Sequence, residues 1–277
     1  MIIDAHQHFW DPDRGDYGWL TPDQDAFWRR FEPDDLEPDL KACGVTGTVL
    51  VQAAPTRRET SWLLQIAETT PWVLGVVGWV DLLSPGASDA IATLARQPHL
   101  VGVRPMLQDL ADPAWIAQAA LDPALSALSH HHLTFDALIR IEHAPFLVQM
   151  ARRHPDLAII VDHAAKPDIS GDDHRRWARV IKDLAALPNL VCKLSGLLSQ
   201  AGPGAGPQDL APYVDTLLAT FGASRLIWGS DWPVLTAVAD YSRWHWLTDS
   251  LLQGVSEPDR HAILAGNAIT TYGLTLR

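Results

Sequence analysis

Two histidines close to the N-terminus are spaced so that they could act together. His6 and His8 lie two residues apart in a short apolar run, and on a β-strand that spacing points both side chains to one face. Two imidazoles on one face can bind a divalent metal or hydrogen-bond a substrate. A buried, hydrogen-bonded core histidine is the alternative for His6, so the meaning of the pair depends on what else reaches the same place.

Polar and aromatic residues also stand at or just beyond the ends of the other apolar runs. In chain order they are Gln52, Trp79, Asp81, Arg104, Asp136, Arg140, Asp162, His163, Lys166, Lys193, Ser195, Ser230, Asp231 and Trp232. Core packing alone does not explain ionisable groups at the end of nearly every run. If the runs are parallel strands of a barrel, their C-terminal ends meet at one face and these groups form one site.

The elements that would position these groups repeat along the chain. Short runs rich in Val, Ile and Leu alternate with segments of helical spacing, and their continuous hydrophobicity is typical of parallel strands buried on both faces. We expect strands at Ile2–His8, Gly47–Ala53, Val73–Val80, Val101–Met106, Leu133–Ile139, Ala158–His163, Leu190–Leu194 and Leu226–Ser230. Eight such units predict an α/β fold, a (β/α)8 TIM barrel, as a single domain over residues 1–277.

Helices are expected between and after the strands. The segments are Leu36–Cys43, Glu59–Thr69, Pro113–Leu128, His143–His154, Asp173–Leu187, Pro207–Phe221, Asp240–Leu252 and Pro258–Leu264. Two long connections leave the C-terminal ends of strands, where barrel enzymes build their sites. The connection from Phe9 to Asp35 is rich in aromatic residues and predicts an ordered aromatic wall. The connection from Ser195 to Gln208 is rich in Gly and Pro, and is either a mobile lid or a flexible loop.

Composition excludes several classes of protein. The chain has 277 residues, 47% of them hydrophobic and 19% charged, which is typical of an ordered globular protein. Its formal net charge of −12 would repel nucleic acid. Cys43 and Cys192 are far apart and predict no disulfide framework. We see no signal-type or membrane-spanning run, and therefore expect a cytoplasmic protein without a membrane partner, either a monomer or a homo-oligomer.

Five motifs carry a resemblance to a known family. They are DAHQHFW at 4–10, GVR at 102–104, VDHAAKP at 161–167, CKLSGL at 192–197 and WGSDWP at 228–233. Together they resemble the amidohydrolase-2 branch of the amidohydrolase superfamily, in particular its sugar-lactone and dicarboxylate-lactone hydrolases. The opening motif is most similar to L-fuconolactonase-like and L-rhamnonolactonase-like sugar-lactone hydrolases. The resemblance runs from Asp4 to the region of Asn267.

The resemblance implies a barrel hydrolase and maps its catalytic positions to His6, His8, His163 and Asp231. Two positions depart from the metal-binding pattern of the superfamily. The fourth strand carries Arg104 where two-metal members have a lysine, and the fifth reads Phe135–Leu138 without a histidine. These departures predict at most one divalent metal, with zinc as the first choice. The ligands would be His6, His8 and Asp231, with His163 as a further candidate; metal-free catalysis stays open.

The reaction we expect is hydrolysis of an aldonolactone, a carboxylic ester, to the open-chain sugar acid. Asp231 would act as the base that activates water, and His6, His8 and His163 would hydrogen-bond the developing oxyanion. Six further residues are expected to hold the substrate: Arg104, Lys166, Gln52, Trp10, Trp79 and Trp232. Lys193 is a weaker candidate, because it could instead form an inward ion pair. Asp162 should face away from His163 and be structural.

Several alternatives remain at this point. The same site could serve a lactone isomerase, a dicarboxylate lactonase or a decarboxylase, or the barrel could be a sugar-acid binding protein without activity. The missing strand-five histidine counts against a decarboxylase, and few arginines at strand ends favour a neutral sugar lactone over a dicarboxylate. The run His130–His132 suggests a metal site, but it falls at the far end of the barrel, where a solvated helix terminus is expected.

Overall fold

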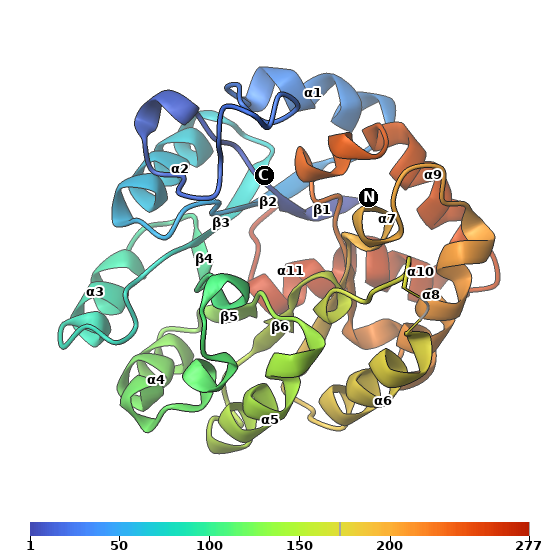
Figure 1. Ribbon diagram of the computed structural model, residues 1–277. Helices are drawn as coiled ribbons and strands as arrows, with labels where there is room; N and C mark the ends of the chain where they lie inside the picture. The colour runs from blue at the N-terminus through green and yellow to red at the C-terminus, as the bar shows by residue number, and fades with distance from the viewer. Residues whose placement is uncertain (172, 277) are drawn as a thin grey trace.

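The computed structural model describes residues 1–171 and 173–276 and shows an eight-stranded barrel (Figure 1). All eight expected strands are present, in the order β1 to β8, and each is parallel to the next. Their bounds are β1 Ile3–Gln7, β2 Gly47–Val51, β3 Val73–Gly78, β4 Leu100–Val103, β5 Thr134–Ala137, β6 Ile159–Val161, β7 Leu190–Leu194 and β8 Leu226–Trp228. The predicted TIM-barrel fold is therefore confirmed.

The seam between β1 and β8 is closed by a few specific hydrogen bonds. The backbone N–H of Asp231 donates to the carbonyl of His6 at 2.8 Å, and that of His8 donates to the carbonyl of Trp232 at 2.7 Å. Beneath them, the buried carboxylate of Asp4 accepts from the backbone N–H and the hydroxyl of Ser230 at 2.8 and 2.6 Å. The two strands that carry the first histidines and the last aspartate are thereby fixed to each other.

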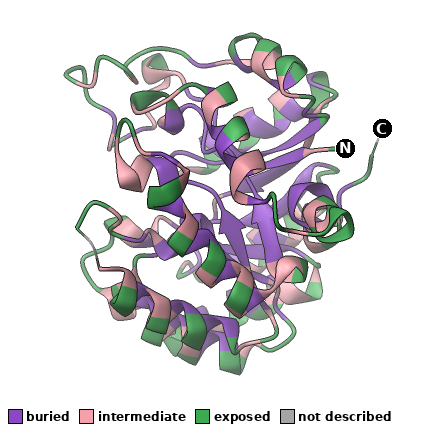
Figure 2. Ribbon diagram, turned by 90° about the vertical axis from the view of Figure 1, so that its right-hand side faces the viewer, coloured by how far each residue is buried: buried purple, intermediate pink, exposed green. Residues whose placement is uncertain are grey.

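Helices surround the barrel, with their buried sides facing the strands (Figure 2). They are α1 Pro33–Ala42, α2 Arg57–Thr69, α3 Ala87–Leu94, α4 Asp122–His130, α5 Ala144–Arg153, α6 His174–Ala185, α7 Leu197–Ala201, α8 Pro207–Phe221, α9 Tyr241–Leu251, α10 Glu257–His261 and α11 Asn267–Tyr272. Within the described residues, none of them is both long enough and apolar enough to cross a membrane.

The expected helices are confirmed in place, with three differences. The single helix predicted over Pro113–Leu128 is wrong: 3-10 turns at Pro113–Ala117 and Ala119–Leu121 precede α4. Pro123 accounts for the late start, because a proline is tolerated in the first turn of a helix but not in its interior. Helices α3 and α11 have no counterpart among the predictions, and the short helix α7 lies inside the Gly- and Pro-rich connection.

The first long connection forms the expected aromatic wall. Trp10 is fully buried, and its ring packs edge-on against Trp19, Phe27 and Phe31. Its indole N–H donates to the carbonyl of Phe27 at 3.0 Å. Buried aromatic rings in edge-to-face contact stabilise a loop that has little regular secondary structure. The loop therefore stands as an ordered rim over the C-terminal ends of the strands.

Candidate active site

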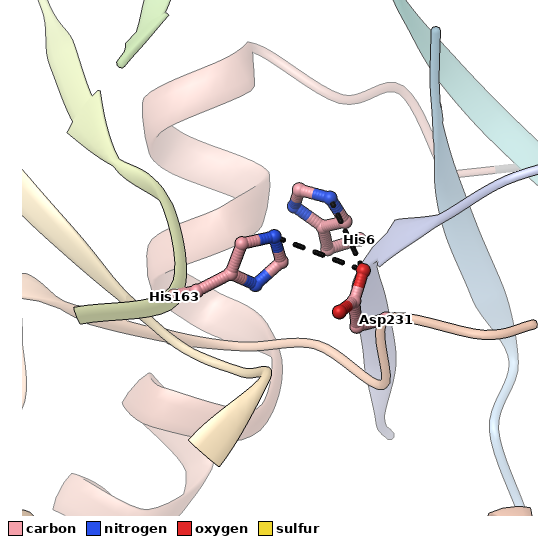
Figure 3. A group of neighbouring side chains, drawn as sticks. All are labelled: His6, His163 and Asp231. Atoms are coloured by element: carbon pink, nitrogen blue, oxygen red, sulfur yellow. Dashed lines mark ion pairs between the residues drawn. The ribbon is translucent and has the colours of Figure 1, made fainter. Parts of the chain in front are cut away.

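The predicted histidines and aspartate meet at the C-terminal end of the barrel. Oδ1 of Asp231 lies 3.4 Å from Nε2 of His8, 3.8 Å from Nε2 of His6 and 3.7 Å from Nε2 of His163. Figure 3 shows His6 and His163 pointing toward this carboxylate from different strands. The ligand atoms of His6, His163 and Asp231 lie within 4.8 Å of one another. The structure thus brings together the four residues that the sequence selected.

Unusual backbone conformations aim two of these side chains. Asp231 has φ of 62°, and the four residues from His163 to Lys166 all have φ between 50° and 57°. Such left-handed conformations cost free energy in residues with a side chain, and they cluster at functional sites. The expected orientation of Asp162, away from His163, is wrong. Simple strand alternation would separate it from His163, but both face His6: its Oδ1 lies 3.4 Å from Nδ1 of His6.

A glycine makes room for the strand-six histidine. Gly196 follows β7 with φ of 67°, and a Cβ at this position would lie 2.7 Å from Nδ1 of His163. That nitrogen is 2.9 Å from the hydroxyl of Ser195. The residues after β7 therefore position His163 in two ways. Gly196 leaves space for the ring, and Ser195 forms a hydrogen bond with it.

Hydrogen bonds at the outer ring nitrogens set which atoms face the pocket. Nδ1 of His8 lies 2.7 Å from the carbonyl oxygen of Val51, which can only accept, so a neutral His8 carries its hydrogen there and presents a lone pair at Nε2. Nε2 of His6 lies 3.2 Å from Nε2 of His8. Nδ1 of His6 lies 3.1 Å from Nζ of Lys193. In the absence of a cation, these contacts fit a chain in which Lys193 donates to His6 and His6 donates to His8.

The same atoms also fit one divalent metal. The separations among Nε2 of His6, Nε2 of His8 and Oδ1 of Asp231 are 3.2, 3.4 and 3.8 Å. Ligands at about 2.0–2.1 Å from a tetrahedral zinc are about 3.3 Å apart. Outer hydrogen-bond partners also exist, Val51 for His8 and Asp162 for His6, as metal-bound imidazoles require. His6, His8 and Asp231 could therefore hold one zinc ion.

Electrostatics keep the aspartate charged and the imidazoles neutral. Burial raises the pKa of Asp231, but His163, His8 and His6 lower it more, and the pKa lies well below its ordinary value. Burial lowers the pKa of His163 to about 4 and also lowers those of His6 and His8. At neutral pH the site therefore combines an ionised carboxylate with three uncharged rings.

A buried charge network lies beneath the site. Lys193 is fully buried, and its Nζ lies 2.7 Å from Asp136 and 3.0 Å from Asp162. Nη1 of Arg104 lies 3.3 Å from both Asp162 and Nε2 of His6. Lys193 therefore does not reach the pocket, and the inward ion pair is its role. Arg104 spans both levels, because it pairs inside the barrel and also lines the pocket.

The catalytic pocket has a volume of about 200 Å³. Its lining residues are His8, Trp10, Trp19, Ala53, Arg104, Met106, Gln108, Leu138, His163, Lys166, Asp231 and Val234. Six of these are predicted site residues, and His6 lies just beneath them. Lys166 donates a hydrogen bond to Gln108 across the pocket. Gln52 donates to the backbone carbonyl of Arg104 at 2.8 Å and lies behind that residue instead of in the lining.

Two of the predicted sugar-contacting tryptophans lie elsewhere. Trp232 is 3% exposed and packs edge-on against Phe9 and Phe31, so it belongs to the core. Trp79 lines a different cavity. Trp19 takes their place in the catalytic pocket. The aromatic composition of the first connection pointed to that loop, but no local signal distinguished Trp19 from its neighbours.

Other pocket residues were missed because nothing local marks them. Met106, Leu138 and Val234 follow different strands and form apolar parts of the pocket wall.

Arg140, a candidate second arginine, is exposed and lies outside the lining. His130–His132 lie at the end of α4 on the surface, as expected of a solvated helix terminus.

Comparison with known proteins gives consistent matches along the chain. A family model described as amidohydrolase matches residues 3–274. An L-fucono-1,5-lactonase of Burkholderia ambifaria is 47% identical over 98% of this chain and 94% of its own length. An L-fucono-1,5-lactonase of Burkholderia multivorans is 34% identical over 99% and 96%. A crystal structure of an amidohydrolase from Burkholderia multivorans with bound zinc superposes with a TM-score of 0.93, at 34% identity, over 99% of this chain and 100% of that one.

Proposed function

Because the chain belongs to the amidohydrolase family, we propose that it hydrolyses a sugar lactone to the open-chain sugar acid. One observation carries the proposal: the ionised carboxylate of Asp231 faces three imidazoles within 3.4–3.8 Å at one end of a pocket of about 200 Å³. The two relatives named L-fucono-1,5-lactonase support a lactone of a neutral monosaccharide as the substrate.

The pocket contains the groups that ester hydrolysis needs. Asp231 would hold a water molecule and accept its proton as the water oxygen bonds to the carbonyl carbon. Negative charge then develops on the carbonyl oxygen, and His163, Arg104 and Lys166 line the space around it. The bond from this carbon to the ring oxygen breaks, and the proton on Asp231 passes to the departing ring oxygen. The product is the open-chain hydroxy acid.

A divalent cation held by His6, His8 and Asp231 would add polarisation of the lactone carbonyl and activation of water. The two departures from the two-metal pattern support a single ion: the guanidinium of Arg104 lies 3.3 Å from Nε2 of His6, and Asp136 is tied to Lys193. We propose zinc as that ion. The relative solved with zinc has the same overall fold.

The charges of the lining favour a neutral substrate. Among the described lining residues, the cations are Arg104 and Lys166, and Arg104 is already paired with Asp162. A dicarboxylate lactone would need more positive charge than this. Nε of Arg104 is a buried donor that meets no acceptor among the residues described. We propose that Arg104 and Lys166, which both line the pocket, hold the lactone.

The test is acid release from a panel of aldonolactones, followed with a pH indicator. Asp231→Asn keeps the shape of the side chain but cannot accept the proton, so we expect a loss of about 10²–10⁴-fold in kcat. Asp25→Asn, an exposed position, is the matched control and should keep full activity. Full activity in Asp231→Asn, with its fold confirmed by circular dichroism, would exclude the proposed base.

The same assay with a chelator assigns the polarising group. Loss of activity that returns with zinc would place this role on the cation. Unchanged activity would place the polarising role on His163, Arg104 and Lys166. Because Asp231 is also a proposed zinc ligand, the zinc content of Asp231→Asn and the wild type is measured in the same assay, which separates lost proton acceptance from lost metal.

A further inference from the structure

A second cavity opens beside the catalytic pocket on the same face of the barrel. Its volume is about 700 Å³, and residues after β1, β2, β3 and β4 form its walls. The lining is Asp16, Gly18, Trp19, Pro55, the segment 79–83, Pro105, Met106, Asp109, Leu110 and Trp115. The catalytic mechanism described above uses none of the residues that belong to this cavity alone.

The two cavities share one wall. Trp19 and Met106 line both of them. The indole N–H of Trp19 donates to the carbonyl of Ala53 at 2.7 Å, and Ala53 itself lines the catalytic pocket. That hydrogen bond fixes the plane of the indole. A molecule in the second cavity would therefore lie against the ring that bounds the substrate.

The chemistry of the second cavity differs from that of the catalytic pocket. Three partly buried indoles, Trp19, Trp79 and Trp115, provide flat apolar faces. Three carboxylates, Asp16, Asp81 and Asp109, provide hydrogen-bond acceptors, and the lining residues that the structure describes include no Lys, Arg or His. The charge of Asp16 is balanced from outside the lining by Arg14 and Arg58. Asp81 and Asp109 are exposed, and neither forms an ion pair with another described residue.

We propose that this cavity is a second carbohydrate subsite, which binds an uncharged sugar ring and rejects a sugar acid. Indole faces can pack against the C–H face of a sugar, while carboxylates accept hydrogen bonds from its hydroxyls. The same carboxylates repel an anion. A ligand site with mostly apolar walls and a few polar groups is the usual architecture for small molecules of this size.

The proposal deepens the proposed function, because it rests on that function for the kind of sugar. Hydrolysis turns a neutral lactone into an anion, so a cavity that selects for uncharged rings distinguishes substrate from product. The subsite would take the second ring of a glycosylated lactone or a separate neutral sugar. Both present the same uncharged ring to the three indoles.

The binding test uses methyl α-L-fucopyranoside as the neutral probe and L-fuconate as the anionic probe, each titrated calorimetrically. The glycoside is not a lactone, so its binding is measured whether or not the protein is a lactonase. We expect the wild type and Asp231→Asn to bind the glycoside equally. Trp79→Ala/Trp115→Ala should bind it at least tenfold more weakly and keep kcat/KM for a monosaccharide lactone within twofold.

A second variant tests the charge selection without disturbing the aromatic walls. Asp109→Lys places a cation at an exposed lining position and should raise affinity for fuconate at least fivefold, whereas Asp25→Lys, at an exposed position outside the lining, should not. Three results would overturn the proposal: glycoside binding that survives loss of both tryptophans, displacement of the bound glycoside by fuconate as readily as by more glycoside, or no change with Asp109→Lys. This last arm remains informative even if the double tryptophan variant does not fold.

Discussion

Nζ of Lys193 lies 3.1 Å from Nδ1 of His6, on the opposite side of the ring from the pocket. The ammonium group also pairs with Asp136 and Asp162, and none of these side chains is exposed. The reactive end of the barrel therefore rests on a buried network of two carboxylates and two cations, Lys193 and Arg104. This relationship explains how His6 can be held in one orientation without touching solvent.

Removing the charge of Lys193 should strongly destabilise the fold. Lys193→Met keeps the length of the side chain but leaves Asp136 without a cation and Asp162 paired with Arg104 alone. We therefore expect a loss of about 3–5 kcal/mol in the free energy of unfolding. Urea unfolding measures it. Adding Asp136→Asn to Lys193→Met should recover part of the loss, because one unpaired charge is removed. Equal stability of the single variant and the wild type would show that the network does not stabilise the fold.

Metal content provides a prediction that does not depend on activity. After incubation with zinc and removal of the excess, the wild type should retain about one zinc ion per chain, as measured by mass spectrometry of the metal. Loss of His6 and His8 together should abolish this, because Asp231 and His163 together supply only two ligands. His130→Ala/His131→Ala removes two surface histidines and should retain the ion. Equal zinc in the site variant and the wild type would place the metal elsewhere.

The activity should persist at pH values well below the ordinary pKa of histidine. His163 has a pKa lowered to about 4, and that of Asp231 lies well below its usual range. The neutral ring and the ionised carboxylate therefore both survive as the pH falls to about 5, and kcat/KM should fall only as the pH approaches 4. The initial rate of lactone hydrolysis in a series of buffers measures this. A decline centred near 6.5 would contradict the neutral, buried state of His163.

Glu59 should make the free energy of unfolding fall as the pH rises. Its buried carboxyl accepts hydrogen bonds from the backbone N–H groups of Ala53 and Ala54, and burial raises its pKa from 4.5 to about 8. Since the folded pKa is the higher one, its contribution is fully present below about 4.5 and is lost as the pH rises through 8. Glu59→Gln should show a smaller fall in unfolding free energy between pH 5 and 9. Parallel profiles for the two proteins would exclude this assignment.

Much of the site could be predicted because strand positions follow from local pattern. The apolar run that contains His6 and the one that precedes Asp231 have no strong competing structure, and parallel strands of a barrel place their ends at one face. The single helix predicted over Pro113–Leu128 is wrong for a local reason too, because Pro123 would lie in its interior, where a proline is disfavoured. Local pattern could not separate Trp79 from Trp19, because both are tryptophans that follow strands and only packing assigns each to a cavity.

The sequence by itself determined the barrel and the residues His6, His8, His163 and Asp231, because hydrophobic period and motif order are properties of the chain alone. The tertiary structure decided where the neighbouring polar groups go. Where the backbone becomes left-handed at His163, both Asp162 and His163 lie beside the ring of His6, and contact across the barrel buries Lys193 beneath that ring. These outcomes depend on atoms that are far apart in sequence and meet only when the barrel closes.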